Sequence, residues 1–335
     1  MDLRSVGVDL VVSEPQVRNI STTDGSGRSV SLQVTVVDGD TERRRPPVVF
    51  CHGFPELAHS WRYQLPAVAA AGFTAVAPDM RGYGETDAPD DVDAYRIDRL
   101  TDDVVGILDA LDAPTGIVVG HDWGGFVAWA APVLHPDRWA GVVGVCTPYL
   151  PFPTTEVLRS LFGDDEAMYM LWFQERGVAE AVLDPRAEAV FTKLLRGGID
   201  LSSVGPDLAR FGANPFLHID ELEPIGPEIV DPADVAHYVE VFARTGFAGG
   251  INWYRNIDAN AARFPQLGTA PLTLPALMLC AEWDPALRPE LAAGMPALCS
   301  DLETHVIPGA GHWVQQEAPA AVNSLLVDWL LRRFS

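Results

Sequence analysis

Short runs of β-branched and other apolar residues alternate with longer helix-like stretches from about residue 46 onward. This alternation is typical of a mostly parallel sheet, because the crossover helices cover both faces and the strands become apolar along their whole length. It predicts an α/β fold. The expected buried strands are 47–51, 74–77, 116–119, 141–145 and 276–280, the expected helices are 61–71, 97–111 and 123–134, and the alternating segment 29–37 is expected to be an antiparallel edge strand.

The alternation stops after Cys146, where Pro148, Pro151 and Pro153 indicate a linker. Helix-like patterns such as 165–174 and 232–244 then follow without a strand candidate until about residue 262, and the strand–helix pattern resumes at Pro275 and ends in a helix over 319–332. We therefore expect a helical insertion within one α/β framework. The predicted division is a core over 1–147, a helical cap over 148–262 and the rest of the core over 263–335.

Composition excludes several classes of partner. The 335 residues include 46 acidic and 23 basic side chains, which give a formal charge of −23, so we expect no binding to nucleic acid or to an anionic membrane surface. With 48% hydrophobic residues the chain can bury a large core. The four cysteines form no C-x-x-C pair and are expected to be buried thiols. Because residues 1–15 lack the pattern of a secretory signal, we expect a cytoplasmic protein.

The most informative motif is Gly120-His121-Asp122-Trp123-Gly124, which follows an expected strand and precedes an apolar helix. It has the glycine frame of a nucleophile elbow, with Asp122 in the place usually taken by serine. The glycines allow a sharp turn that lifts one side chain above the sheet. The alternative interpretation of Asp122 is an ordinary helix N-cap after a glycine turn.

Three further segments complete a catalytic pattern. Residues 51–56 follow the first buried strand, where nucleophile-elbow enzymes place a backbone N–H for an oxyanion. Asp284 follows the strand 276–280, and His312 follows the run 304–307 on a glycine-flanked loop. Asp284 also precedes a proline and can simply begin a turn, but the order nucleophile, acid, histidine is that of an α/β-hydrolase.

These segments resemble the soluble-type epoxide hydrolases of the α/β-hydrolase fold. The resemblance rests on residues 52–56 (HGFPE), 79–84 (DMRGYG), 120–125 (GHDWGG) and 311–313 (GHW), and it continues through the insertion at 169–175 (YMLWFQE), 177–180 (GVAE) and 252–256 (NWYRN). It covers about residue 46 to the C-terminus. It implies an α/β-hydrolase core with an inserted cap and places Tyr169 and Tyr254 as proton donors.

A carboxylate nucleophile is already ionised at neutral pH, which leaves the histidine free for a second step. Asp122 would attack a saturated carbon to form an alkyl ester. His312, oriented by Asp284, would then activate the water that hydrolyses this ester. The expected oxyanion donors are the backbone N–H groups of Phe54 and Trp123. We derive no role for His121 from the sequence.

The leaving group separates an epoxide from an alkyl halide. An epoxide opens to a strongly basic alkoxide that needs a proton donor, and tyrosine is still protonated at neutral pH. The two tyrosines therefore favour an apolar epoxide and water as substrates, with no cofactor and no metal. The alternatives are a haloalkane or haloacid dehalogenase and a catalytically silent binding protein. The residues expected at an aromatic pocket are Phe54, Trp123, Phe152, Trp172, Phe173 and Trp253.

Overall fold

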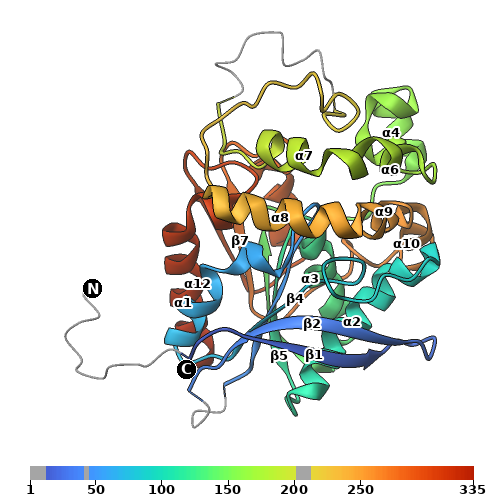
Figure 1. Ribbon diagram of the computed structural model, residues 1–335. Helices are drawn as coiled ribbons and strands as arrows, with labels where there is room; N and C mark the ends of the chain where they lie inside the picture. The colour runs from blue at the N-terminus through green and yellow to red at the C-terminus, as the bar shows by residue number, and fades with distance from the viewer. Residues whose placement is uncertain (1–12, 41–44, 201–212) are drawn as a thin grey trace.

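The computed structural model describes residues 13–40, 45–200 and 213–335, and these contain one eight-stranded sheet (Figure 1). The strand order is β1-β2-β4-β3-β5-β6-β7-β8. β1 and β2 are antiparallel to their neighbours, and the remaining strands are parallel to one another. The bounds are β1 Gln16–Thr23, β2 Ser29–Val37, β3 Val48–Cys51, β4 Ala75–Pro78, β5 Gly116–His121, β6 Trp139–Val145, β7 Ala276–Ala281 and β8 Leu302–Ile307.

Helices cover both faces of this sheet, as the apolar strands require. Successive side chains of a strand point to opposite faces, so Val118 of β5 lies in one apolar core while Ile117 and Val119 lie in the other. The first core is closed by α2 (Ile97–Ala110) and α3 (Trp123–Leu134), and the second by α1 (Gln64–Ala70) and α12 (Pro319–Phe334). The α/β fold expected from the sequence is confirmed.

Two of the predicted elements differ in the structure. The segment 29–37 is a strand, but β1 pairs with its outer side, so β2 is an inner strand and the expectation of an edge strand is wrong. The predicted helix 165–174 is a 3₁₀ turn at Asp165–Ala167 followed by the short helix α5 (Tyr169–Trp172). The break falls at Met168, whose extended backbone (φ −133°, ψ 123°) forms a bridge with Ala213 and cannot continue a helix.

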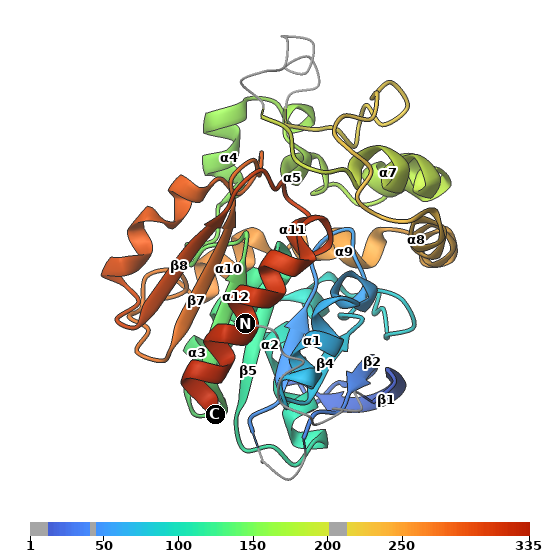
Figure 2. The same cartoon turned by 90° about the vertical axis from the view of Figure 1, so that its left-hand side faces the viewer.

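The described residues between β6 and β7 form helices and turns and contain no strand longer than an isolated bridge. Figures 1 and 2 show α4, α7 and α8 as a layer across one end of the sheet. The helices of this stretch are α4 Thr155–Phe162, α5 Tyr169–Trp172, α6 Val178–Leu183, α7 Ala187–Leu194, α8 Pro232–Thr245, α9 Ala248–Tyr254 and α10 Ile257–Arg263.

The predicted buried thiols are confirmed, since Cys51, Cys146, Cys280 and Cys299 are all free and buried. Within the described ranges, no helix is long and apolar enough to span a bilayer. Most of the segment 1–15, which is expected to lack a secretory signal, lies outside the described residues.

Candidate active site

Four loops that follow parallel strands bring the predicted groups together. Phe54 follows β3, Asp122 follows β5, Asp284 follows β7 and His312 follows β8. Because these strands are parallel, their carboxyl ends share one edge of the sheet, which is where such sheets place their ligands. Residues far apart in the sequence therefore meet at a single site.

The turn that carries Asp122 is strained in the way that a nucleophile elbow requires. Asp122 has a φ of 51° and a ψ of −122°, which is rare for a residue with a side chain. The turn is also too tight for side chains at its flanks. A Cβ at Gly120 would lie 1.9 Å from the carbonyl oxygen of Gly124, and one at Gly124 would lie 2.1 Å from the carbonyl oxygen of Cys51.

The Asp122 carboxylate faces two backbone N–H groups, those of Phe54 and Trp123, and one imidazole. The N–H of Phe54 donates to Oδ1 at 2.8 Å, and Nε2 of His312 lies 3.7 Å from Oδ2. Burial raises the pKa of Asp122, whereas His312, His121 and the backbone N–H groups of Phe54 and Trp123 lower it. The two N–H groups lie where a negative oxygen on this carboxyl group would be stabilised.

His312 is held between two carboxylates. Its Nδ1 lies 2.7 Å from Oδ2 of Asp284, and the other oxygen of Asp284 accepts from the N–H groups of Ala286 and Leu287 at 2.9 and 2.8 Å. Burial lowers the pKa of His312, but the carboxylates of Asp284 and Asp122 outweigh it and raise the pKa to about 9. Burial raises the pKa of Asp284, but His312 and the two N–H groups hold it well below its usual range. At neutral pH the ring therefore carries the proton and Asp284 is ionised.

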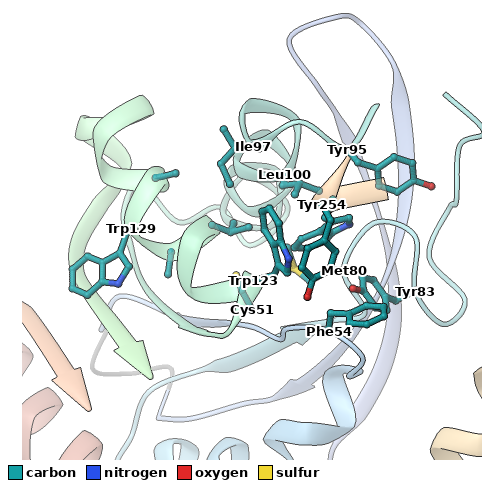
Figure 3. Close-up of a cluster of buried hydrophobic side chains, with 14 of the residues drawn as sticks. Cys51, Phe54, Met80, Tyr83, Tyr95, Ile97, Leu100, Trp123, Trp129 and Tyr254 are labelled. Carbon is teal, nitrogen blue, oxygen red and sulfur yellow. The ribbon is translucent and has the colours of Figure 1, made fainter. Parts of the chain in front are cut away.

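Tyr169 and Tyr254 come from separate helices, α5 and α9, and meet with their ring centroids 5.5 Å apart. The ring of Tyr254 also packs against those of Phe54 (5.4 Å) and Trp123 (5.1 Å), and Figure 3 shows these three side chains gathered together. Burial raises the pKa of both phenols, and the Asp122 carboxylate raises them further. Both tyrosines therefore keep their protons over the physiological pH range.

The other predicted pocket residues fall into two groups. Phe173 packs against Phe54 at 5.5 Å, and Phe152 lies 5.9 Å from Trp123, so both contact the residues around Asp122. Trp253 also contacts one of these residues, with its ring centroid 6.0 Å from that of Trp123, whereas Trp172 does so only through Phe173. Trp172 packs on Phe173 at 5.7 Å, and Trp253 is completely buried, with its Nε1 donating to the backbone carbonyl of Arg81.

Two residues that received no predicted role, Glu56 and His121, form a buried pair behind the triad. Nδ1 of His121 lies 2.7 Å from Oε2 of Glu56, and its Nε2 lies 2.7 Å from the carbonyl oxygen of His312. Both groups that face the ring nitrogens, a carboxylate and a backbone carbonyl, are hydrogen-bond acceptors. Burial raises the pKa of Glu56, but His121 outweighs it and brings the pKa to about 2. The pair therefore connects the turn that carries Asp122 to the loop that carries His312.

The described part of the chain contains one group with the donor types and spacing of a metal site, formed by His121, Cys146 and His312. Most of the nitrogen and sulfur atoms that could bind a metal here are already hydrogen-bonded. Both nitrogens of His121 are hydrogen-bonded, Nδ1 of His312 is bonded to Asp284, and the Cys146 thiol donates to the His312 carbonyl at 3.3 Å. Burial raises the pKa of Cys146 well above its usual value, which disfavours the thiolate that a metal would need.

Comparison with known proteins adds to this geometry. Residues 46–197 match the family described as alpha/beta hydrolase fold. The chain is 41% identical over 293 residues to Epoxide hydrolase A of Mycobacterium tuberculosis, and the match covers 85% of this chain and 90% of that protein. It is 36% identical to Bifunctional epoxide hydrolase 2 of Rattus norvegicus, but there it spans only 51% of the relative's length.

A solved structure shows the same likeness in three dimensions. The crystal structure of Epoxide Hydrolase A from Mycobacterium thermoresistibile superimposes with a TM-score of 0.82 at 39% identity, covering 96% of this chain and 99% of that one. The similarity thus extends through the insertion as well as the sheet.

Proposed function

The chain belongs to the epoxide hydrolases of the α/β-hydrolase fold, and we propose that it opens its substrate through a covalent ester on Asp122. The observation that carries this proposal is a single cluster: Asp122, His312 and Asp284 contact one another, and two protonated tyrosines, Tyr169 and Tyr254, pack on the residues beside Asp122. An epoxide hydrolase adds water to an epoxide and yields a vicinal diol.

In the first step the carboxylate of Asp122 attacks an epoxide carbon. A new C–O bond forms to the carboxyl group, the ring C–O bond breaks, and its electron pair stays on the epoxide oxygen. Tyr254 and Tyr169 hydrogen-bond this oxygen, and one of them gives it a proton. The products are an ester with a neighbouring hydroxyl group and one tyrosinate.

Ester formation removes the negative charge of Asp122. The pKa of His312 therefore falls, and its proton restores the tyrosinate. Neutral His312 then takes a proton from water, and the hydroxide attacks the ester carbonyl of Asp122. The N–H groups of Phe54 and Trp123 support the resulting oxyanion, as the 2.8 Å contact from Phe54 to Oδ1 suggests. On collapse the diol oxygen takes the proton of the new carboxyl group, which leaves Asp122 ionised and His312 protonated, as at the start.

The surroundings of the site support an apolar substrate, because aromatic rings pack around Asp122. We propose that the substrate contacts an aromatic pocket formed by the predicted residues Phe54, Trp123, Phe152, Trp172, Phe173 and Trp253. We also retain the predicted division into a cap over 148–262 and a core over 1–147 and 263–335, since Tyr169 and Tyr254 then come from the cap and the triad from the core. Because the relatives reported above are all named epoxide hydrolases, we propose neither a dehalogenase nor a silent binding protein.

Trapping the ester tests the proposal. His312→Gln should form the ester and fail to hydrolyse it, so the intact mass should rise by the mass of one substrate, on the peptide that contains Asp122. Tyr169→Phe combined with Tyr254→Phe should prevent this mass increase in the same background. Tyr149→Phe is a matched control, because Tyr149 is buried and its hydroxyl donates to Ala270 instead. An adduct on another residue, or one that forms equally fast without the two tyrosines, would reject the assignment.

A further inference from the structure

Tyr254 is the last residue of the short helix α9, and its neighbour Trp253 attaches this helix to the core. The indole Nε1 of Trp253 donates to the backbone carbonyl of Arg81 at 3.1 Å, and the side chain is completely buried. The indole ring also packs edge-on against Trp123, the residue that follows the nucleophile, with centroids 6.0 Å apart. One side chain therefore links the helix of a proposed acid to both the core loop and the nucleophile elbow.

The acceptor of this hydrogen bond is itself held rigidly. Arg81 is fully buried and forms a two-pronged ion pair with Asp103, in which Nε and Nη2 lie 2.8 Å from the two carboxylate oxygens. Its Nη1 donates to Asp24 at 3.0 Å and to the carbonyl of Ala94 at 2.7 Å. Bidentate arginine pairs of this kind fix geometry as well as charge. The carbonyl to which Trp253 donates thus belongs to a fixed part of the core.

The start of α9 touches the same loop through backbone alone. A Cβ at Gly249 would lie 2.0 Å from the carbonyl oxygen of Gly82, so only glycine permits this approach. A Cβ at Gly250 would lie 2.5 Å from the hydroxyl of Tyr83. The helix is therefore seated on residues 81–83 at its first turn and hydrogen-bonded to Arg81 near its last residue.

The segment after α9 is attached to the other cap helices. Arg255 forms an ion pair with Glu180 at 2.7 Å, and Nε2 of Gln174 donates both to the carbonyl of Tyr254 at 2.9 Å and to that of Met170 at 2.7 Å. Those contacts place Tyr254 relative to the segment of Tyr169. Trp253 supplies the contact that places it relative to the core, where the nucleophile lies.

From these contacts we propose that Trp253 is a positioning residue for ring opening. It holds the Tyr254 phenol within hydrogen-bond distance of the epoxide oxygen while Asp122 attacks the epoxide carbon. The inference rests on the proposed role of Tyr254 as an acid. Proton transfer in the transition state requires hydrogen-bond distance, and a displacement of about 1 Å can cost about 100-fold in rate. Hydrolysis of the ester uses His312 and does not use this phenol, so only the first step should depend on Trp253.

The test is a double-mutant cycle on the rate of ester formation, measured in single turnovers with a chromogenic styrene-type epoxide. Trp253→Phe keeps an aromatic ring and removes the N–H donor. We expect ester formation to slow about 10-fold in the wild-type background and by less than about 2-fold in the Tyr254→Phe background, because the group that Trp253 positions is then absent. The rate of ester hydrolysis should be unchanged.

Trp329→Phe is the matched control, because Trp329 is equally buried, belongs to α12 in the opposite core and has an Nε1 without a partner among the described residues. It should leave both rates unchanged. An equal slowing by Trp253→Phe in both backgrounds, or no slowing in the wild-type background, would overturn the inference. If Tyr254→Phe alone leaves ester formation unchanged, the proposed acid itself is wrong, so the two failures are distinguishable.

A second variant keeps the inference testable if Trp253→Phe does not fold. Gly249→Ala must displace the start of α9 from Gly82, and it should produce the same pattern of a slowed first step that disappears in the Tyr254→Phe background. Gly294→Ala is its control, because a Cβ there meets no atom within 4 Å. A Gly249→Ala enzyme that forms the ester at the wild-type rate would contradict the proposed seating of α9.

Discussion

The negative charge of Asp122 should control the protonation of His312. The Asp122→Asn substitution keeps the shape of the side chain and the acceptor for the N–H of Phe54 but removes the charge, as ester formation does. At the 3.7 Å that separates Oδ2 from Nε2, a unit charge contributes about 4 kcal/mol at an effective dielectric constant of about 20, which corresponds to about 3 pKa units. The pKa of His312 should thus fall from about 9 in the wild-type protein to about 6 in the variant.

Nitrogen-15 NMR of histidine-labelled protein measures this pKa directly. The His312 signals are identified by their loss in His312→Gln, and the intact mass verifies that the asparagine is retained. Asp102→Asn is the matched control, because Oδ1 of Asp102 faces a different ring, that of His135, at 3.2 Å, and the substitution should leave the pKa of His312 unchanged. A His312 pKa that stays near 9 in Asp122→Asn would refute the reasoning that ester formation releases the base.

Two further substitutions test the groups around the triad. Asp284→Asn should slow ester hydrolysis by about 1,000- to 10,000-fold in single turnovers, because the imidazole loses the carboxylate that orients it and stabilises its charge, and hydrolysis at the wild-type rate would contradict that role. Glu56→Gln should lower the free energy of unfolding in urea by about 3 kcal/mol near neutral pH, because it removes the buried carboxylate that pairs with His121, whereas Glu188→Gln on the surface should have no effect. Since the pKa of Glu56 is lowered to about 2, this difference should be fully present above about pH 4.5 and disappear as the pH falls through about 2, and a pH-independent difference would contradict the ion pair.

The sequence was sufficient to predict the parallel part of the sheet, because strands buried on both faces are apolar throughout. The helix predicted over 123–134 has the observed bounds of α3, since the nucleophile turn before it and the histidine after it are both visible in the sequence. β1 was not predicted. Six of its eight residues are exposed, so it has no apolar alternation to reveal it. Without β1, the alternating pattern of the neighbouring segment 29–37 predicts an edge strand.

The candidate site likewise contains residues that the sequence reveals and contacts that only the folded chain reveals. Asp122, Asp284 and His312 were found because each follows a strand in a fixed order, which is a local signal. The contacts of Glu56 and His121 depend on three loops meeting in space, and no spacing in the sequence encodes that. For the same reason, Trp253 was expected at the pocket on the basis of its residue type, whereas its hydrogen bond to Arg81, 172 residues away, exists only in the folded chain.

In the covalent route, the oxygen added to the substrate comes from Asp122 and is replaced there by an oxygen from water. A single turnover with excess enzyme in H₂¹⁸O measures this, with mass spectrometry of both the diol and the peptide that contains Asp122. The first diol should be unlabelled, and the label should appear in the Asp122 carboxyl group. Label in the first diol, with none in Asp122, would contradict the covalent route.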